Sequence, residues 1–246
     1  MSKCIGIVIP TYNEKDNIIP LIKSIFETLS NIGLKHYVIV VDDNSPDGTA
    51  NVVREYFKTI DNVEVIVRPG KMGLGSAILT GFQKILDKEC ITHIITMDAD
   101  FSHDPRDLKI MLSDLNKADI IIGSRYVENG EIIGWSFKRR LISIIANNIV
   151  KILYRTGLKD HTSNYRVYSR RAIEYILKYS TTSSYEWVVE SLLICKALGL
   201  KIVEKPVRFV DRKKGSSKLS LRDIVKWFLF ILKYRLKYSM LKKKTL

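Results

Sequence analysis

Apolar runs and helical ladders alternate along the first half of the chain. Short, β-branched apolar runs predict strands that are covered on both faces. They lie at residues 4–9, 37–41, 63–67, 93–97 and 119–123. Between them, apolar residues recur at three- and four-residue spacing, which predicts helices at residues 18–29, 52–56, 74–86 and 108–115. This alternation with short connections predicts an α/β fold, with a doubly wound, mainly parallel sheet flanked by helices.

Polar loops follow each predicted strand. They cover residues 10–14, 42–47, 68–75, 98–102 and 124–126. In sheets of this kind, ligands bind beyond the carboxyl ends of the strands. We therefore expect these five loops to converge on one edge of the sheet and to form the ligand site.

The fourth loop carries two carboxylates, Asp98 and Asp100, directly after a buried strand. Two carboxylates close together repel each other unless a cation lies between them. Aspartate and serine oxygens, including that of Ser102, are hard ligands suited to Mg²⁺ or Mn²⁺. An isolated Asp-x-Asp is more often an acidic surface turn, here leading to Asp104-Pro105. The converging loops favour a metal site that holds a phosphorylated ligand.

Other ligand chemistries fit the loops less well. The glycines of residues 70–75 follow the third strand in a G-x-x-G-x-G pattern, whereas the NAD fingerprint is G-x-G-x-x-G after the first strand. The chain has no P-loop motif and no nucleophile elbow. A nucleoside diphosphate held by a metal, which would neutralise the departing diphosphate as a Lewis acid, fits better.

The second half is less regular. It predicts helices at residues 137–154, 173–177, 189–198 and 221–244, and strands at 201–204 and 207–211. The last helix is basic and rich in aromatic residues, which is typical of a helix lying in a membrane interface. We expect a catalytic domain over residues 1–220 and a membrane-associating amphipathic helix over residues 221–246.

Charge supports this division. The formal net charge is +14, and residues 201–246 carry fifteen Lys or Arg against three Asp or Glu. A tail of this kind binds a polyanion, either an anionic membrane or nucleic acid. The three cysteines are scattered, which suits a reducing compartment and excludes a disulfide framework. We find no signal-peptide pattern and no apolar run long enough to span a membrane.

Six motifs occur in one order along the chain. They are PTYNE at 10–14, DDNSPDGT at 42–49, DADFSH at 98–103, GSRY at 123–126, GWSFKR at 134–139, and FVDR at 209–212 with GSSK at 215–218. In this combination the chain resembles the dolichyl-phosphate mannose synthases, inverting glycosyltransferases of the GT-A (Rossmann-like) fold. The resemblance covers residues 4 to about 220.

The resemblance implies metal-dependent transfer of mannose from GDP-mannose to dolichyl or another polyprenyl phosphate, giving a β-linked product for glycan assembly. It implies that the nucleoside is held by Pro10, Tyr12, Glu14, Val41 and Asp43. The metal and diphosphate would be held by Asp98, Ala99, Asp100 and Ser102. The acceptor phosphate would meet Arg125, Arg139, Ser143 and Arg212, with Arg212 and Lys218 also near the donor. The catalytic residues would be Asp100, Arg125, Arg139 and Arg212.

The chemistry of the acceptor agrees with these residues. A phosphate monoester has its second pKa near ~6, so it is already a nucleophile at neutral pH and needs no general base. Arginines then only position it and screen its repulsion from the donor. We accordingly interpret His103 and His161 as structural polar residues.

Two departures from the family pattern leave the sugar open. Asn164 replaces a Gly or Ser of the family, and we expect the turn to survive because Asn tolerates a left-handed φ. Val188 replaces a frequent Gln, while the neighbouring Glu190 is kept. The alternative is a polyprenyl-phosphate glucosyltransferase that uses UDP-glucose.

The tail leads to three expectations about partners and location. We expect peripheral attachment to an anionic membrane surface, on the cytoplasmic face and without a transmembrane segment. The tail helix could also recruit a membrane-protein partner. The alternative from a different class is a basic nucleic-acid-binding protein, although we expect no nucleic-acid partner.

Overall fold

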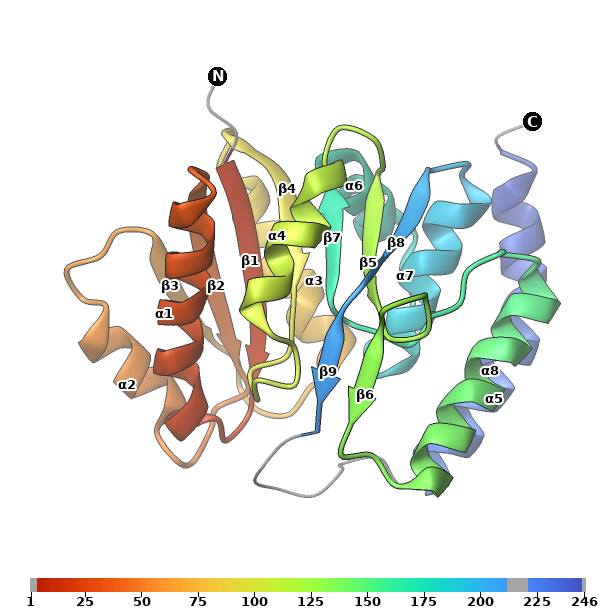
Figure 1. Ribbon diagram of the computed structural model, residues 1–246, viewed down its shortest axis with the longest axis horizontal. Coiled ribbons are helices and arrows are strands. Elements are labelled where there is room, and N and C mark those ends of the chain that lie inside the picture. Colours follow the sequence, from red (N-terminus) through yellow and green to blue (C-terminus); the bar gives the residue numbers. More distant parts are fainter. Residues whose placement is uncertain (1–3, 212–220, 245–246) are drawn as a thin grey trace.

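The computed structural model describes residues 4–211 and 221–244, with side chains of 221–224 excluded. A seven-stranded sheet forms its centre, in the order β3-β2-β1-β4-β7-β5-β8 (Figure 1). The strands are β1 (Cys4–Thr11), β2 (Lys35–Asp42), β3 (Val63–Val67), β4 (Ile91–Thr96), β5 (Ile120–Ser124), β7 (Arg166–Ser169) and β8 (Ile202–Pro206). All neighbours pair in parallel except β7, which runs antiparallel to β4 and β5.

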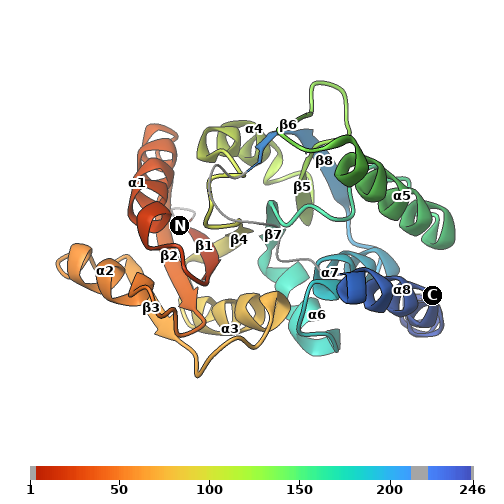
Figure 2. The ribbon, with the colours of Figure 1, turned by 90° about the horizontal axis from the view of Figure 1, so that it is seen from below.

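Helices cover both faces of this sheet, as Figure 2 shows end-on. The helices are α1 (Lys15–Asn31), α2 (Thr49–Tyr56), α3 (Leu74–Leu86), α4 (Leu108–Met111), α5 (Phe137–Tyr154), α6 (Arg170–Tyr179), α7 (Glu186–Ala197) and α8 (Leu221–Lys242). One apolar cluster includes residues of α1, α2 and α4, and the other includes residues of α3, α6 and α7. This confirms the mainly parallel, two-sided α/β architecture that the alternating pattern predicts.

The strand period decides which cluster each side chain enters. In β1, Ile5, Ile7 and Ile9 pack into the α1-side cluster, whereas Val8 packs into the α3-side cluster. Successive residues of a strand point to opposite faces, so a fully covered strand is apolar throughout. Helix α3 lies so close to β1 that a Cβ atom on Gly81 would be 2.4 Å from Val8 Cγ1.

Three sequence predictions need correction. Strand β7 was not predicted, because four residues with an arginine at the start resemble no apolar strand. The expected strand at 207–211 is the shorter β9 (Arg208–Val210), which pairs with the unpredicted β6 (Glu131–Ile133) in a separate two-stranded sheet. The expected helix at 108–115 is only α4, flanked by 3₁₀ turns at Pro105–Asp107 and Leu112–Asp114.

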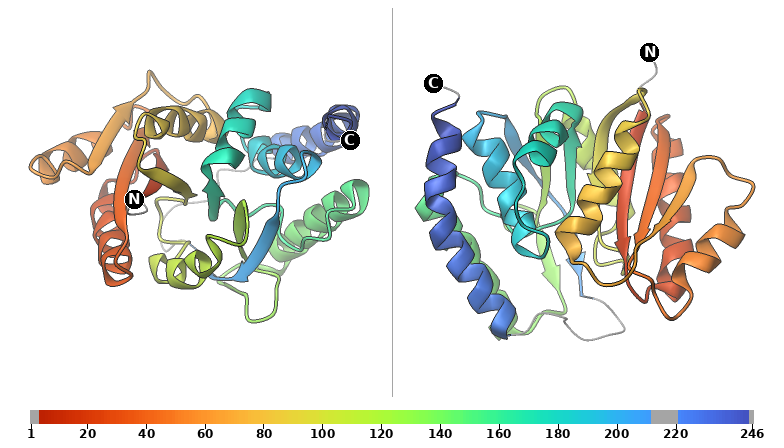
Figure 3. Two further views of the ribbon diagram at one scale, coloured as in Figure 1. Left: turned by 90° about the horizontal axis from the view of Figure 1, so that it is seen from above. Right: turned by 180° about the vertical axis from the view of Figure 1, so that it is seen from behind.

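Helices α5 and α8 lie side by side at the end of the molecule far from β3 (Figures 1 and 3). The Tyr154 hydroxyl of α5 donates a hydrogen bond to the Ile231 carbonyl of α8 at 2.5 Å. On α8, Ile231, Tyr234 and Leu241 are buried in the cluster that also contains α7. None of the helices described in residues 4–211 and 221–244 is long and apolar enough to cross a membrane.

Candidate active site

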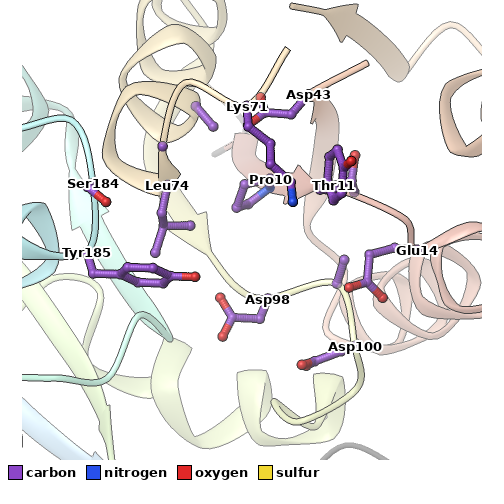
Figure 4. A pocket seen from close by; sticks show the side chains of 14 residues that line it. Pro10, Thr11, Glu14, Asp43, Lys71, Leu74, Asp98, Asp100, Ser184 and Tyr185 are labelled. Carbon is purple, nitrogen blue, oxygen red and sulfur yellow. The ribbon is translucent and has the colours of Figure 1, made fainter. Parts of the chain in front are cut away.

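The polar loops meet at the carboxyl edge of the sheet, around a cavity of about 360 Å³ (Figure 4). The cavity lies beyond β1, β2 and β4, as expected for a parallel sheet. Of the residues expected to hold a donor, its lining includes Pro10, Tyr12, Glu14, Asp43, Asp98, Ala99 and Asp100. Val41 does not line it, because its side chain is fully buried in the apolar core. We call this space the donor cavity.

Hydrogen bonds join the first two loops beside the cavity. The backbone N–H of Asn13 donates to Ser45 Oγ at 3.0 Å, and the N–H of Glu14 donates to Thr49 Oγ1 at 3.0 Å. Asn13 and Asn44 adopt left-handed φ values of 59° and 55°, which asparagine tolerates better than most residues. The PTYNE and DDNSPDGT motifs are therefore one interlocked structure rather than two separate loops.

Asp98 and Asp100 lie on one wall of this cavity, near Glu14 (Figure 4). Asp98 Oδ1 accepts a hydrogen bond from Asn164 Nδ2 at 3.0 Å, and Asp100 Oδ1 accepts one from the Ser102 N–H at 3.0 Å. Directly after Asp100, Phe101 has φ = 60°, a conformation that costs a bulky residue about 1–2 kcal/mol. The two hydrogen bonds orient the carboxylates at the cavity.

These carboxylates fit a divalent ion that is shared with a substrate. Within the described residues, no group of three or more His, Cys, Asp and Glu side chains could hold a metal by itself. Mg²⁺ is commonly bound by one or two carboxylates together with substrate phosphates, and Asp98 and Asp100 meet that requirement. Ser102 is 2% exposed, and its Oγ makes no hydrogen bond within the described residues. It lines a neighbouring cavity and not this one.

Two basic residues of the third loop were not among the expected site residues: Lys71, which lines the donor cavity, and Arg68, which contacts the lining residue Asp43. Arg68 Nε donates to Asp43 Oδ1 at 2.6 Å, and Arg68 Nη1 donates to Ser76 Oγ at 2.6 Å. Lys71 lines the cavity, and its Nζ lies 3.8 Å from the centre of the Tyr12 ring. Basic residues beside glycines in a loop at a strand end can indicate anion binding. From the sequence, only the glycines of this loop were considered and not its basic residues.

A second cavity of about 280 Å³ adjoins the donor cavity, and we call it the acceptor cavity. The two cavities share Leu74, Asp98 and Tyr185 in their linings. Polar residues of the acceptor cavity include Ser102, Arg125, Arg139, Ser143 and Ser163. Its apolar residues include Ile142, Ala146, Val188, Val189 and Trp227. The expected acceptor residues Arg125, Arg139 and Ser143 are thus brought together, beside Asp98.

Arg125 is held by a buried ion pair with Asp160. Arg125 Nε and Nη2 donate to the two carboxylate oxygens of Asp160 at 2.8 Å each. Burial by itself disfavours both charges, but their attraction outweighs it, so the pKa of Arg125 is raised and the pKa of Asp160 is lowered. Asp160 therefore offsets much of the positive charge that Arg125 would offer to a phosphate.

Arg139 is paired less tightly. Its Nη1 donates to both carboxylate oxygens of Asp211 at 2.9 Å, and both side chains are partly exposed. Its guanidinium lies 4.3 Å from the centre of the Trp135 ring, and that of Arg125 lies 5.2 Å from the same ring. Trp135, within the GWSFKR motif, is not among the site residues expected from the sequence. Arg212 and Lys218 lie outside the described residues.

Both histidines near the site are buried and serve as hydrogen-bonding partners. His103 Nδ1 accepts from the Asp98 N–H at 3.1 Å, and the ring stacks on Tyr165. Burial lowers the pKa of His103, although Asp98 and Asp100 oppose the shift. Burial also lowers the pKa of His161, to about 4, and its Nε2 lies 2.7 Å from Thr156 Oγ1. These contacts agree with structural roles for both rings.

Asn164 corrects one sequence prediction. It is not among the residues with positive φ, so the expected left-handed turn is wrong. Its side chain instead donates to Asp98, while its Oδ1 is buried and has no hydrogen-bond partner within the described residues. This contact was invisible in the sequence because 66 residues separate the partners.

The mainly parallel sheet and the acidic cavity at its carboxyl edge match the GT-A glycosyltransferase fold. A family model for glycosyl transferase family 2 matches residues 6–177. The chain belongs to glycosyltransferase family 2.

Two named relatives are similar over most of the chain. Polyprenol monophosphomannose synthase of Mycolicibacterium smegmatis is 35% identical over 222 residues, covering 89% of this chain and 82% of the relative. Undecaprenyl-phosphate mannosyltransferase of Micrococcus luteus is 35% identical over 214 residues, covering 87% and 86%.

Solved structures agree on the fold. Glucosyl-3-phosphoglycerate synthase from Mycobacterium tuberculosis, in complex with Mn²⁺, uridine diphosphate and phosphoglyceric acid, matches with a TM-score of 0.66 at 18% identity, covering 96% of this chain and 78% of that one. Mannosyl-3-phosphoglycerate synthase from Rubrobacter xylanophilus matches with a TM-score of 0.66 at 17% identity, covering 99% and 76%.

Proposed function

We propose that this protein transfers mannose from GDP-mannose to a polyprenyl phosphate. The observation that carries the proposal is the pair of adjoining cavities that share Asp98, one acidic and the other lined by arginines and apolar side chains. A sugar nucleotide in the first cavity and a lipid phosphate in the second would meet at Asp98. The two relatives named for mannosyl transfer to polyprenyl phosphates support the choice of sugar and acceptor.

In the donor cavity, the nucleoside would lie against Tyr12 and Asp43, whose carboxylate is oriented by Arg68. Asp98 and Asp100 would hold Mg²⁺ or Mn²⁺ with the diphosphate. The ion supplies Lewis-acid stabilisation of the departing diphosphate. Lys71 lines the same cavity and would add a positive charge near the nucleotide, besides that of the metal ion.

In the acceptor cavity, Arg139 and Arg125 would bind the acceptor phosphate. Arg125 would use its Nη1, since its Nε and Nη2 donate to Asp160. Arg139 would give up its ion pair with Asp211 to bind the phosphate. A phosphate oxygen attacks the anomeric carbon of mannose from the face opposite the nucleotide. The new C–O bond forms while the bond to the β-phosphate breaks, and GDP leaves with the electron pair. The second pKa of a phosphate monoester is near ~6, so no protein base is required. Attack from the face opposite the α-linked GDP inverts the anomeric carbon, so the product is β-linked.

The lipid chain would leave through the apolar side of the acceptor cavity, between Ile142, Ala146 and Trp227. From there, α5 and α8 carry an exposed apolar surface that we call the membrane face. It consists of Phe137, Leu141, Ile142, Ile144, Ile145 and Ile152 on α5, and Val225, Phe228, Leu229, Leu232, Leu236 and Met240 on α8. Exposed apolar helices flanked by basic residues bind membrane interfaces, so we propose peripheral attachment, on the cytoplasmic leaflet.

Transfer is tested with labelled GDP-mannose, Mg²⁺ or Mn²⁺, and a polyprenyl phosphate, by following a charged lipid product. UDP-glucose is assayed in parallel. Product from GDP-mannose alone supports the proposal. Turnover with UDP-glucose and none with GDP-mannose would overturn the choice of donor, and no lipid product from either sugar nucleotide would overturn the choice of reaction.

Membrane binding is tested by flotation with vesicles that contain anionic lipid. Phe137 is 80% exposed, so the double variant Phe137→Ser/Leu236→Ser should bind more weakly than the wild type without disturbing the core. Ile110→Ser, at an exposed apolar residue of α4, is the matched control and should bind normally. No flotation of the wild type, together with tight and salt-dependent binding to nucleic acid, would contradict the membrane role.

A further inference from the structure

The loop between α6 and α7 separates the two cavities. Ser184 and Tyr185 line the donor cavity, and Tyr185 also lines the acceptor cavity. Figure 4 shows the Tyr185 hydroxyl directed towards the Asp98 carboxylate. The position of this loop therefore sets the shape of both cavities where sugar and phosphate would meet.

A buried carboxylate on α7 anchors the loop. Glu190 is fully buried, and its oxygens accept hydrogen bonds from the backbone N–H groups of Thr181 and Thr182 at 2.9–3.1 Å. The hydroxyls of both threonines donate to the same carboxylate at 2.6 Å. Burial by itself raises the pKa of Glu190, but these hydrogen bonds outweigh it and the pKa is lowered. Glu190 is thus a charged anchor for the start of the loop.

The cation that faces this carboxylate comes from the tail helix. Lys237 of α8 places its Nζ 3.2 Å from Glu190 Oε1, 2.9 Å from Thr181 Oγ1 and 2.7 Å from the Tyr179 carbonyl oxygen. Its side chain is 26% exposed, whereas that of Glu190 is fully buried. Lys237, on one of the two helices that carry the membrane face, therefore contacts both ends of the segment 179–181 and the Glu190 carboxylate.

The other side of the loop is fixed against the donor cavity. The Ser76 N–H of α3 donates to the Ser183 carbonyl at 2.9 Å. Gly73 has φ = 96°, and a Cβ atom there would lie 2.4 Å from the same carbonyl oxygen. The contact leaves no room for a side chain, so the loop packs directly against the wall of the donor cavity.

We propose that Lys237 and Glu190 are positioning residues for sugar transfer, which act by holding Tyr185 at the boundary between the two cavities. The inference rests on the proposed function and deepens it. The tail helix is then part of the catalytic architecture in addition to its place in the membrane face. Small displacements of groups around a reacting centre reduce rates steeply, because reacting atoms must be held within a fraction of an ångström.

The first test compares Lys237→Met with the matched control Lys233→Met. Lys233 is exposed on the same helix and makes no side-chain hydrogen bond or ion pair among the described residues. The assay uses the full-length protein, GDP-mannose, Mg²⁺ and a short-chain, water-soluble prenyl phosphate without vesicles, so that membrane binding plays no part. We expect kcat to fall about tenfold to a hundredfold for Lys237→Met. Lys233→Met should be unchanged, and Lys237→Arg, which keeps the charge, should recover most of the activity.

The second test separates positioning from general stability by a double-mutant cycle with Tyr185→Ala. If Lys237 acts through Tyr185, adding Lys237→Met to Tyr185→Ala should change kcat less than about twofold. Multiplicative effects of the two substitutions, or a normal kcat for Lys237→Met, would overturn the proposal. Thermal unfolding of each variant shows whether it is folded. A wild type inactive with both GDP-mannose and UDP-glucose would instead refute the proposed function.

Discussion

Replacing Asp160 by asparagine tests the buried ion pair that holds Arg125 in the acceptor cavity. The Asp160 side chain is 0% exposed and that of Arg125 is 6% exposed. Asp160 also accepts hydrogen bonds from the backbone N–H groups of Thr162 and Ser163 at 3.2 and 3.1 Å. Asparagine retains one oxygen for these backbone donors. Its NH2 group takes the place of Oδ2, which accepts from the backbone N–H and the Nε of Arg125 at 3.0 and 2.8 Å, so the substitution removes both the negative charge and the acceptor that face Arg125.

The expected cost is set by burial. An exposed ion pair contributes about 0.2–1 kcal/mol, whereas removing one partner of a buried pair costs about 3–5 kcal/mol because the other charge stays buried and uncompensated. We therefore expect Asp160→Asn and Arg125→Met each to lower the free energy of unfolding by about 3–5 kcal/mol. In a domain of this size, that corresponds to a fall in Tm of about 6–20 °C.

Urea unfolding of the two single variants and of the double variant measures the coupling. The double variant leaves no unpaired buried charge, so it should be less destabilised than the sum of the single variants by about 1–3 kcal/mol. It should still lack transferase activity, because the Arg125 nitrogen that faces the acceptor cavity is gone. Single-variant costs below about 1 kcal/mol, or strictly additive effects, would refute the argument that this pair is buried and coupled.

The pH dependence follows from the same pair. The pKa of Asp160 is lowered from its ordinary value of 3.8 in the folded protein. The unfolded state therefore binds the proton first as pH falls, and the stability that the carboxylate contributes is present above pH 3.8 and lost below it. The difference in stability between wild type and Asp160→Asn should shrink in acid. A difference that stays constant to pH 3 would contradict this account.

Three further predictions concern the donor cavity and the buried histidine. Asp100→Asn should reduce metal-stimulated transfer about a hundredfold or more, measured over a Mg²⁺ titration, and near-normal activity would remove Asp100 from the mechanism. Asn164→Gly removes the amide that orients Asp98 and should lower kcat/KM about tenfold, with a higher metal requirement; an unchanged metal titration would contradict this. The pKa of His161, lowered to about 4, means that the unfolded state binds the proton first below pH 6.5. Urea unfolding of the wild type should therefore lose about 2–3 kcal/mol between pH 6.5 and 4.5 relative to His161→Gln, and equal losses would contradict it.

The sequence by itself determined most of the sheet and the edge at which ligands bind. Short, β-branched apolar runs such as those of β1 and β2 predict strands covered on both faces, and the polar ends of parallel strands then meet at one edge. The motifs PTYNE and DADFSH therefore indicated the donor cavity without a structure. The two-residue period of a strand is a local property, because neighbouring residues alone decide it.

Tertiary structure alone decided which distant side chains meet. The insertion of β7 between β4 and β5 brings Asn164 to Asp98, and the packing of α8 on α7 brings Lys237 to Glu190, across 66 and 47 residues of chain. The hydrophobic pattern of neighbouring residues does not predict such contacts, because they depend on how whole helices and strands pack. The same holds for Arg125, which reads as a free cation in the sequence but is paired with buried Asp160 in the fold. Hydrophobic periodicity determines where the helices and strands form. Their packing determines which charged and polar side chains of the site pair with each other.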